Sequence, residues 1–356
     1  MIAGFPELYS DELLYSLFAR YYAQSGHMAY VFAAEELFEN RTIKPDIEFM
    51  DKLTAEVINL ITREKSLKEI VEQHTMFPYF ARFLALERRK QALVMLLQMD
   101  ERYHNLLYQM KSKHVLRYLR YCPLCAEDDR NQHGETFWHR SHQLHGVEVC
   151  PKHHCFLCNS AESISSKGSP SLVCADMLIP AQRTAVPCEN ALLCAIADYV
   201  HAVFQSPVDM ETDIPVGRFL HSKLEYTKYL SPRGEKRNVA LLFADYAAFY
   251  ASLPQNPLDE QWKMQKMFSS ERLSTYEVCL VAMFLGIAPQ ELTRMTLPSV
   301  SQPEWFDAKV RELHAQGLKY PAIARIMNAP YDVVKFIGNR KMKTSPCANH
   351  LLQDGK

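Results

Sequence analysis

The sequence lacks a long apolar run. No stretch of about 18 uncharged apolar residues occurs among its 356 residues, so no transmembrane helix is predicted. The opening MIAGFPELYSDELLYS has neither a basic start nor an extended apolar segment, which argues against a secretory signal peptide. The sequence therefore predicts a cytoplasmic protein whose thiols stay reduced.

The sequence also has almost no net charge. Its 40 Lys and Arg residues balance 41 Asp and Glu residues, which leaves a formal charge of −1. Proteins that coat DNA without sequence preference are usually far more basic. Any contact with nucleic acid must therefore come from local basic patches or be shared with partners.

No catalytic motif is present. The patterns GxxxxGK[ST], GxGxxG, GxSxG and HExxH do not occur. The pair Glu35 and Glu36 has no evident partner for a two-metal site, and the acidic stretch 126–129 (AEDD) is interpreted as a solvated loop. Four histidines lie between positions 133 and 145, with no recognisable nucleophile to serve. The sequence therefore shows no recognisable catalytic constellation.

The 10 cysteines are not spaced as a secreted disulfide framework, and the first is at position 122. The segments CPLC (122–125) and CPKH (150–153) each place two ligand-type side chains three positions apart, with 24 residues (150 − 125 − 1) between them. Two such turns can converge on one tetrahedral ion. The sequence predicts a closed, structural Zn²⁺ site with four ligands: Cys122, Cys125, Cys150 and His153.

Other readings of these cysteines remain open. They could be buried, unpaired thiols, and a redox CxxC is a further alternative, although the flanking sequence looks helical rather than βαβ. The fourth ligand is also open, because His154 and Cys155 follow His153 directly. Cys155 and Cys158 could even begin a second site with Cys174 and Cys188, although the latter two do not form a second knuckle.

Apolar residues recur at helical spacing over most of the chain, so the predicted fold class is mainly α. A first helix should bury Leu13, Leu14, Leu17, Phe18 and Tyr21, with Ser10, Asp11 and Glu12 at its N-terminus. Further helices are expected at 28–39, 46–63 and within 85–120, and Val147 and Val149 indicate a short strand. The expected domains are a helical N-terminal region (1–120), a zinc-ribbon module (121–160), a Ser-rich linker (161–188), a helical DNA-binding region (189–300) and a C-terminal helix-turn-helix (301–345).

The C-terminal pattern predicts a helix-turn-helix. Helices at 304–315, 321–327 and 331–337 are separated by Gly317 and by the pair Ala329-Pro330. Their shared core should consist of Ile323, Ala324, Met327, Val333, Val334 and Ile337. Tyr331, Lys335, Asn339 and Arg340 would then face a major groove, and Lys341 and Lys343 would meet phosphates. A helical hairpin without a DNA role is the alternative, which Asp332 slightly favours.

Six ordered motifs occupy the first part of the chain: PELYSDELLYS (6–16), EQHTMFPYF (72–80), ERR (87–89), RYCPLC (120–125), GETFWHR (134–140) and CPKH (150–153). Together they resemble the TnsD/TniQ family, the target-site selection proteins of Tn7-like transposons. The HTMFPYF and ERR segments look closer to TnsD than to the RNA-guided TniQ adaptors. Family members are often longer, so the sequence leaves open whether this chain is a short member or lacks a C-terminal part.

The resemblance implies a non-catalytic protein of the bacterial cytoplasm, associated with the nucleoid. It would bind double-stranded attachment-site DNA and recruit a TnsC-like AAA+ regulator, which brings the transposase. In that reading Phe5, Pro6 and Tyr9 would dock the regulator. Charge and position, rather than a matched motif, nominate the DNA contacts: Arg218, Lys223, Lys228, Arg233, Lys236, Arg237, Arg294, Tyr331, Lys335, Asn339, Arg340 and Lys341. The alternative, favoured by the near-neutral charge, is a TniQ-type adaptor that links an RNA-guided CRISPR surveillance complex to the regulator.

Overall fold

The computed structural model describes residues 2–107, 117–164, 171–231, 236–269, 273–297 and 304–339. The chain forms two compact units. Unit 1 comprises Met1–Leu220 and Phe243–Thr296, and unit 2 comprises His221–Leu242 and Leu297–Lys356. The units therefore group the chain differently from the predicted domains, because the N-terminal helices, the cysteine-rich module and most of the following helices share one unit.

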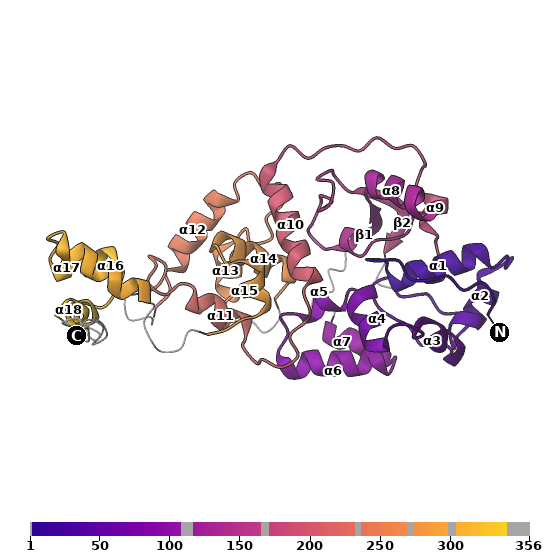
Figure 1. Ribbon diagram of the computed structural model, residues 1–356, viewed down its shortest axis with the longest axis horizontal. Helices are drawn as coiled ribbons and strands as arrows, with labels where there is room; N and C mark the ends of the chain where they lie inside the picture. Colours follow the sequence, from indigo (N-terminus) through magenta and orange to yellow (C-terminus); the bar gives the residue numbers. More distant parts are fainter. Residues whose placement is uncertain are drawn as a thin grey trace, which may run out of the picture. The chain divides into compact units, whose positions relative to one another are not determined.

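Short helices make up the first part of unit 1, drawn in indigo to purple in Figure 1. The predicted face of the first helix is buried, as expected. The elements are α1 (Leu14–Gln24), α2 (Tyr30–Leu37), α3 (Ala55–Ile61), α4 (Leu67–His74), α5 (Phe77–Ala81), α6 (Leu86–Leu97), the 3-10 turn η1 (Glu101–Tyr103) and α7 (His104–Leu107).

The predicted helix over 46–63 is wrong in its first half, since helix α3 begins only at Ala55. The carboxylate of Asp46 accepts hydrogen bonds from the backbone N–H groups of Glu48, at 2.8 Å, and Phe49, at 3.0 Å. Such side-chain bonds offer the backbone an alternative to the helix. The helix therefore starts later, where the Thr54 side chain accepts from the Val57 N–H and caps it.

The start of α1 also differs from the prediction. Leu13 occupies the N-cap, and no acidic residue lies in the first turn. Asp11 has a positive φ of 60°, which turns the backbone before the helix. Glu12 is buried and forms an ion pair with Arg20, with 2.9 Å between Glu12 Oε2 and Arg20 Nη1. The two acidic residues therefore hold tertiary contacts instead of capping the helix.

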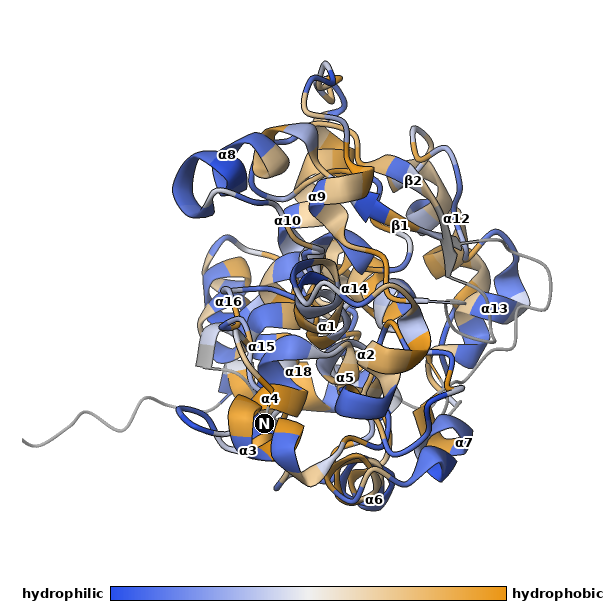
Figure 2. Ribbon diagram, turned by 90° about the vertical axis from the view of Figure 1, so that its right-hand side faces the viewer, coloured by the Kyte–Doolittle hydropathy of each residue, from blue (hydrophilic) through white to orange (hydrophobic). Residues whose placement is uncertain are grey.

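The cysteine-rich module contains β1 (Arg117–Tyr121), α8 (Pro123–His133), the 3-10 turn η2 (Ser141–Gln143), β2 (Cys158–Ile164) and α9 (Ala175–Leu178). The two strands pair antiparallel, with Arg120 opposite Asn159 and Tyr121 opposite Cys158. Figures 1 and 2 both show α8 and α9 beside these strands, and α8 is largely hydrophilic in Figure 2.

Four expectations for this module were wrong. Residues 117–121 form a strand rather than the end of a helix, and β2 occupies the start of the expected linker. Residues 126–129 lie on α8, not in a loop, and Asp129 is buried. The predicted strand at 147–149 is reduced to an isolated bridge between Val149 and Phe156. The module is organised by its side-chain contacts more than by strand pairing.

The remaining helices follow the module in sequence. They are α10 (Ala191–Gln205), α11 (Val216–Ser222), α12 (Val239–Phe249), α13 (Gln261–Lys266), α14 (Thr275–Phe284) and α15 (Pro289–Thr293). The side chain of Asn190 caps α10 by accepting from the N–H groups of Leu192 and Leu193. Among the residues that the structure describes, no helix is long and apolar enough to cross a membrane.

Unit 2 contains α16 (Glu304–Ala315), α17 (Tyr320–Ile326) and α18 (Tyr331–Asn339). The predicted helix at 304–315 is confirmed, and the third helix runs two residues further than expected. Gly317, with φ of +90°, provides the left-handed residue that follows α16. Of the predicted core, Val333 is only partly buried and packs against the other members. The buried cluster is Phe306, Val310, Leu313, Ile323, Ala324, Met327, Ala329, Val334 and Ile337.

A buried ionic network joins the first motif to the GETFWHR motif in unit 1. The His139 ring lies between two carboxylates, with Nε2 2.9 Å from Asp129 Oδ2 and Nδ1 3.7 Å from Asp11 Oδ2. Burial alone would lower the pKa of His139, but the two carboxylates outweigh it and raise the pKa to about 9. Arg140 extends the network by donating to the backbone carbonyls of Glu72 and Thr75 at the end of α4.

We expect this network to make stability depend on pH above neutrality. Folding raises the pKa of His139 from 6.5 to about 9, so the protonated ring stabilises the folded state. This stabilisation is complete below pH 6.5 and is lost as the pH rises through 9. The shift corresponds to at most about 3 kcal/mol in the free energy of unfolding. Urea unfolding between pH 6.5 and 9 should show this decline, and His139→Gln should flatten it. The matched control is His154→Gln, because His154 is exposed; an equal pH slope in all three proteins would contradict the assignment.

Candidate metal centre and nucleic-acid interface

Two tight turns position the predicted metal ligands. Cys122 is the N-cap of α8, and its Sγ accepts from the backbone N–H of Cys125 at 3.4 Å, while Pro123 starts the helix. The second turn closes where the N–H of His154 donates to the carbonyl of Cys150 at 2.9 Å. Each turn therefore directs two ligand-type side chains to the same side.

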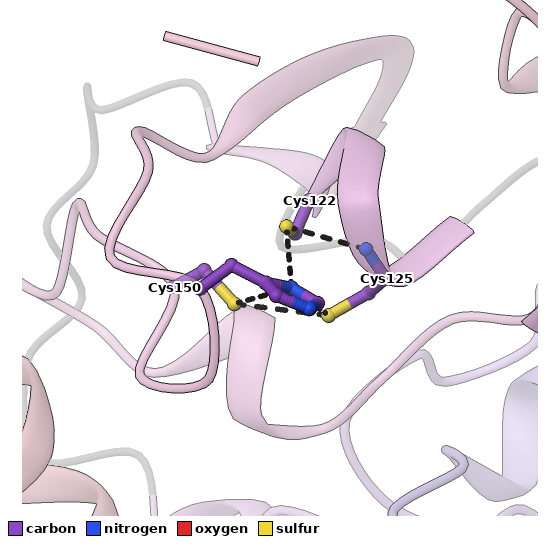
Figure 3. Close-up of side chains that lie close together, drawn as sticks. Cys122, Cys125 and Cys150 are labelled. Atoms are coloured by element: carbon purple, nitrogen blue, oxygen red, sulfur yellow. Dashed lines mark hydrogen bonds between the residues drawn. The ribbon is translucent and has the colours of Figure 1, made fainter. Parts of the chain in front are cut away.

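The structure brings the four predicted residues together. One donor atom from each of Cys122, Cys125, Cys150 and His153 lies within 4.8 Å of the others, and all three cysteines are buried. Figure 3 shows the three labelled cysteine side chains pointing toward one another. The sulfur atoms of Cys125 and Cys150 are 3.7 Å apart, and His153 Nδ1 lies 3.4, 3.3 and 3.9 Å from the sulfurs of Cys122, Cys125 and Cys150.

These separations fit a tetrahedral zinc ion. With Zn–S bonds of about 2.3 Å and a Zn–N bond of about 2.0 Å, ideal geometry places sulfur atoms about 3.8 Å apart and sulfur and nitrogen about 3.5 Å apart. The observed S–S distance of 3.7 Å and the S–N distances of 3.3 to 3.9 Å agree with these values. A Cys₃His donor set of this kind is typical of structural zinc sites.

A carboxylate fixes the orientation of the His153 ring. The Nε2 atom of His153 lies 3.3 Å from Asp128 Oδ2, on the opposite side of the ring from Nδ1. The same carboxylate accepts from Lys152, which is the largest cause of the lowered pKa of Asp128. If Nε2–H donates to Asp128, the lone pair of Nδ1 is free for a metal, as in many zinc sites. Asp128 was not among the predicted site residues, although an acidic residue three positions after Cys125 could have indicated it.

The ionisation of the cluster also fits a cation. Hydrogen bonding with Cys125 and Cys150 lowers the pKa of Cys122, whereas the interaction with Cys122 raises the pKa of Cys150 to about 11. One thiolate can thus be stabilised by its neighbours, but several buried thiolates repel each other. A divalent cation removes this conflict, because it stabilises all three thiolates.

Cys155 is the closest rival for the fourth ligand position. Its sulfur is buried and lies 3.3 Å from that of Cys122, shorter than a tetrahedral edge between two sulfur ligands. Among the described residues, one cluster of Cys, His, Asp or Glu side chains is close enough to hold a metal ion. It consists of Cys122, Cys125, Cys150 and His153, and it does not include Cys155. The second site considered for Cys155, Cys158, Cys174 and Cys188 is therefore not assembled there.

The predicted DNA contacts divide between the two units. Arg218 on α11 and Arg294 after α15 are exposed residues of unit 1. Arg233, Arg340 and Lys341 lie outside the described residues. Unit 2 holds the rest, of which Arg237 is half-buried with its Nη1 3.1 Å from His221 Nδ1. These unit 2 residues are Lys223, Lys228, Lys236, Arg237, Tyr331, Lys335 and Asn339.

The near-zero net charge hides a strong separation of charge. Unit 2 carries 14 Lys and Arg residues against 7 Asp and Glu residues, a net charge of +7. Unit 1 carries the other 26 of the 40 basic residues and 34 of the 41 acidic residues, a net charge of −8. The smaller unit is therefore strongly basic and the larger unit acidic.

The three residues nominated for partner docking are half-buried on unit 1. The guanidinium of Arg20 lies 4.0 Å from the Tyr9 ring centroid, and the Tyr9 hydroxyl donates to Glu135 at 3.2 Å. The ring of Phe5 lies 5.3 Å from that of Tyr21, between ring centroids. Tyr9 is thus fixed within the unit, and a docking role for Phe5, Pro6 and Tyr9 stays a prediction.

The six motifs lie within a region that matches a known protein family. The TniQ family model matches residues 3–157, which include all six motifs and the four clustered ligand residues. This region belongs to the TniQ family. The transposition protein TnsD of transposon Tn7 from Escherichia coli is 30% identical over 153 residues. That match covers 42% of this chain and only 30% of the relative, so the similarity concerns the TniQ region and not the whole of either protein.

Two substitutions should separate the metal ligands from the neighbouring thiol. Cys122→Ser removes a ligand, so we expect loss of bound zinc and unfolding of the module at a lower temperature. Cys155→Ser should keep one zinc ion per chain, because Cys155 lies outside the four-residue set. Elemental analysis and thermal melts of the full chain measure both effects. Zinc loss in Cys155→Ser with retention in His153→Ala would mean that Cys155, not His153, is the fourth ligand.

Proposed function

We propose that this protein selects the target site of a Tn7-like transposon. In this proposal unit 2 binds a specific attachment-site duplex, and the TniQ region recruits a TnsC-like AAA+ regulator, which in turn brings the transposase. The observation that carries the proposal is the joining of a TniQ region to a separate unit with a net charge of +7. The protein itself would carry out no chemical step.

The similarity to Tn7 TnsD supports the transposition role of the TniQ region. That relative is a transposition protein by name, and the match to the TniQ family model, over residues 3–157, includes every motif. The match covers 30% of the relative, so it supports a role in transposition for the TniQ region only. Target selection by the whole chain is our proposal.

The proposed role of Zn²⁺ is structural. Cys122, Cys125, Cys150 and His153 would occupy all four positions of a tetrahedral ion, which leaves none for water or substrate. The ion would tie the start of α8 to the turn at 150–153, and Asp128 would hold the His153 ring in place. The module then stays folded although its two short strands bury little apolar surface.

The DNA-binding role of unit 2 is supported by its helices and its charge. Three helices with a shared core, the last one exposing Lys335 and Asn339, have the arrangement of a helix-turn-helix domain. In such domains the recognition helix enters the major groove, and basic side chains outside it meet phosphates. Lys223, Lys228 and Lys236 supply such positive charge in the same unit.

The first test measures DNA binding. The purified full chain should bind one duplex sequence selected from a random pool, with affinity that falls steeply as salt rises. Lys335→Ala should weaken this binding about tenfold, as expected for loss of one contact worth 1–3 kcal/mol. Lys309→Ala on α16 is the matched control, because Lys309 is exposed in the same unit and pairs with Glu312. Binding to DNA only in the presence of a guide-RNA complex would favour the adaptor function instead.

The second test measures recruitment of the regulator. Phe5→Ala should weaken binding of the AAA+ regulator about tenfold, as an aromatic anchor at an interface would. It should leave DNA affinity and melting temperature nearly unchanged, because Phe5 is only half-buried. Phe249→Ala on α12 is the control for loss of an exposed phenyl ring. Equal binding of the regulator by Phe5→Ala and the unaltered protein would exclude Phe5 from the docking surface.

A further inference from the structure

Helix α18 presents one continuous stripe of side chains to solvent. Tyr331, Asp332, Lys335, Phe336 and Asn339 line a shallow groove along the helix. At about 100° per residue they span roughly 140° of the helix surface. The opposite side of the helix carries the buried residues of the unit 2 core, Val334 and Ile337. The packing of α18 therefore determines which side chains are available to a ligand.

This stripe is poorly suited to phosphates. It contains one acidic and one basic residue, Asp332 and Lys335, so its net charge is zero although the unit as a whole carries +7. Affinity for the DNA backbone depends on clustered positive charge. Side chains that are mixed in charge and partly apolar are instead suited to the edges of bases, where donors, acceptors and methyl groups alternate.

Two polar members of the stripe are already oriented. The hydroxyl of Tyr320 donates to Asn339 Oδ1 at 3.0 Å, which leaves the amide N–H groups of Asn339 as donors for a ligand. The ammonium group of Lys335 lies 5.8 Å from the ring centroid of Tyr331. Both side chains thus offer hydrogen-bond donors, which match the N7 and O6 acceptors of purines in the major groove.

Phe336 is the apolar member of the stripe, and hydrogen bonding to bases gives it no role. Its side chain is 67% exposed, the most exposed aromatic side chain among the described residues. A base edge in the major groove displays one apolar group, the 5-methyl group of thymine. We propose that Phe336 packs against a thymine methyl group and so determines the base at one position of the bound site. This inference rests on the proposed DNA-binding function of unit 2.

The test uses DNA that differs by a single methyl group. After selection of the bound site with the full chain, each thymine in turn is replaced by deoxyuridine, which keeps the base pair and removes only the methyl group. The unaltered protein should lose about fourfold in affinity at one position, the value of one buried apolar carbon. Phe336→Ala should lose at least as much on thymine DNA and should no longer distinguish thymine from uracil at that position.

The matched control is Ile326→Ala. Ile326 lies on α17 outside the stripe and is 59% exposed, so its removal changes a similar amount of apolar surface. This variant should keep the thymine preference of the unaltered protein. Circular dichroism melts of both variants check that the fold is retained, as expected for exposed positions.

The outcomes separate this inference from the proposed function. If the full chain binds no duplex sequence selectively, the DNA-binding function of unit 2 fails, and the inference fails with it. If binding is selective but Phe336→Ala keeps the preference for thymine, or the unaltered protein has none, the inference alone is overturned. Loss of regulator binding in Phe336→Ala with unchanged DNA binding would likewise overturn it, because the stripe would then bind a protein.

Discussion

Helix α8 connects the parts of unit 1 through two neighbouring carboxylates. Asp128 contacts the His153 ring of the candidate metal centre, and Asp129 contacts His139 in the buried ionic network. Cys122, one of the four residues of the candidate metal centre, is the N-cap of this helix. This 11-residue helix, which is hydrophilic overall, can hold this central place because its acidic side chains reach partners in two separate parts of the unit.

The family motifs mark residues that contact one another across the unit. The carbonyl of Glu12, in the first motif, accepts from the His74 ring at 2.9 Å. The backbone N–H of Leu13 donates to the carbonyl of Trp138 at 3.0 Å, and Arg140 reaches the end of α4. Segments far apart in sequence are therefore joined by buried hydrogen bonds. Since a buried polar group without a partner costs free energy, such residues depend on each other.

Charge is divided unevenly between the two units. The TniQ region lies in a unit with a net charge of −8, and the three C-terminal helices lie in a unit with +7. A single value of −1 for the chain conceals both. The proposed division follows from this: the acidic unit would be repelled by DNA and would serve protein partners, while the basic unit would hold the duplex.

The sequence by itself determined the four residues of the candidate metal centre, the family of the region 3–157 and the helices of the C-terminal motif, because each depends on local spacing. A short turn with two ligand-type side chains three positions apart directs both to one side, whatever surrounds it. Gly317 and Pro330 likewise mark helix boundaries through their own backbone preferences and not through distant contacts. Only the tertiary structure decided the roles of Asp11, Glu12 and Asp129, which look like capping or solvated residues but are enclosed by distant partners. It also decided how charge divides between the units, since residues 221–242 group with helices about 80 positions later in the chain. Contacts of that range depend on packing, which local patterns do not encode.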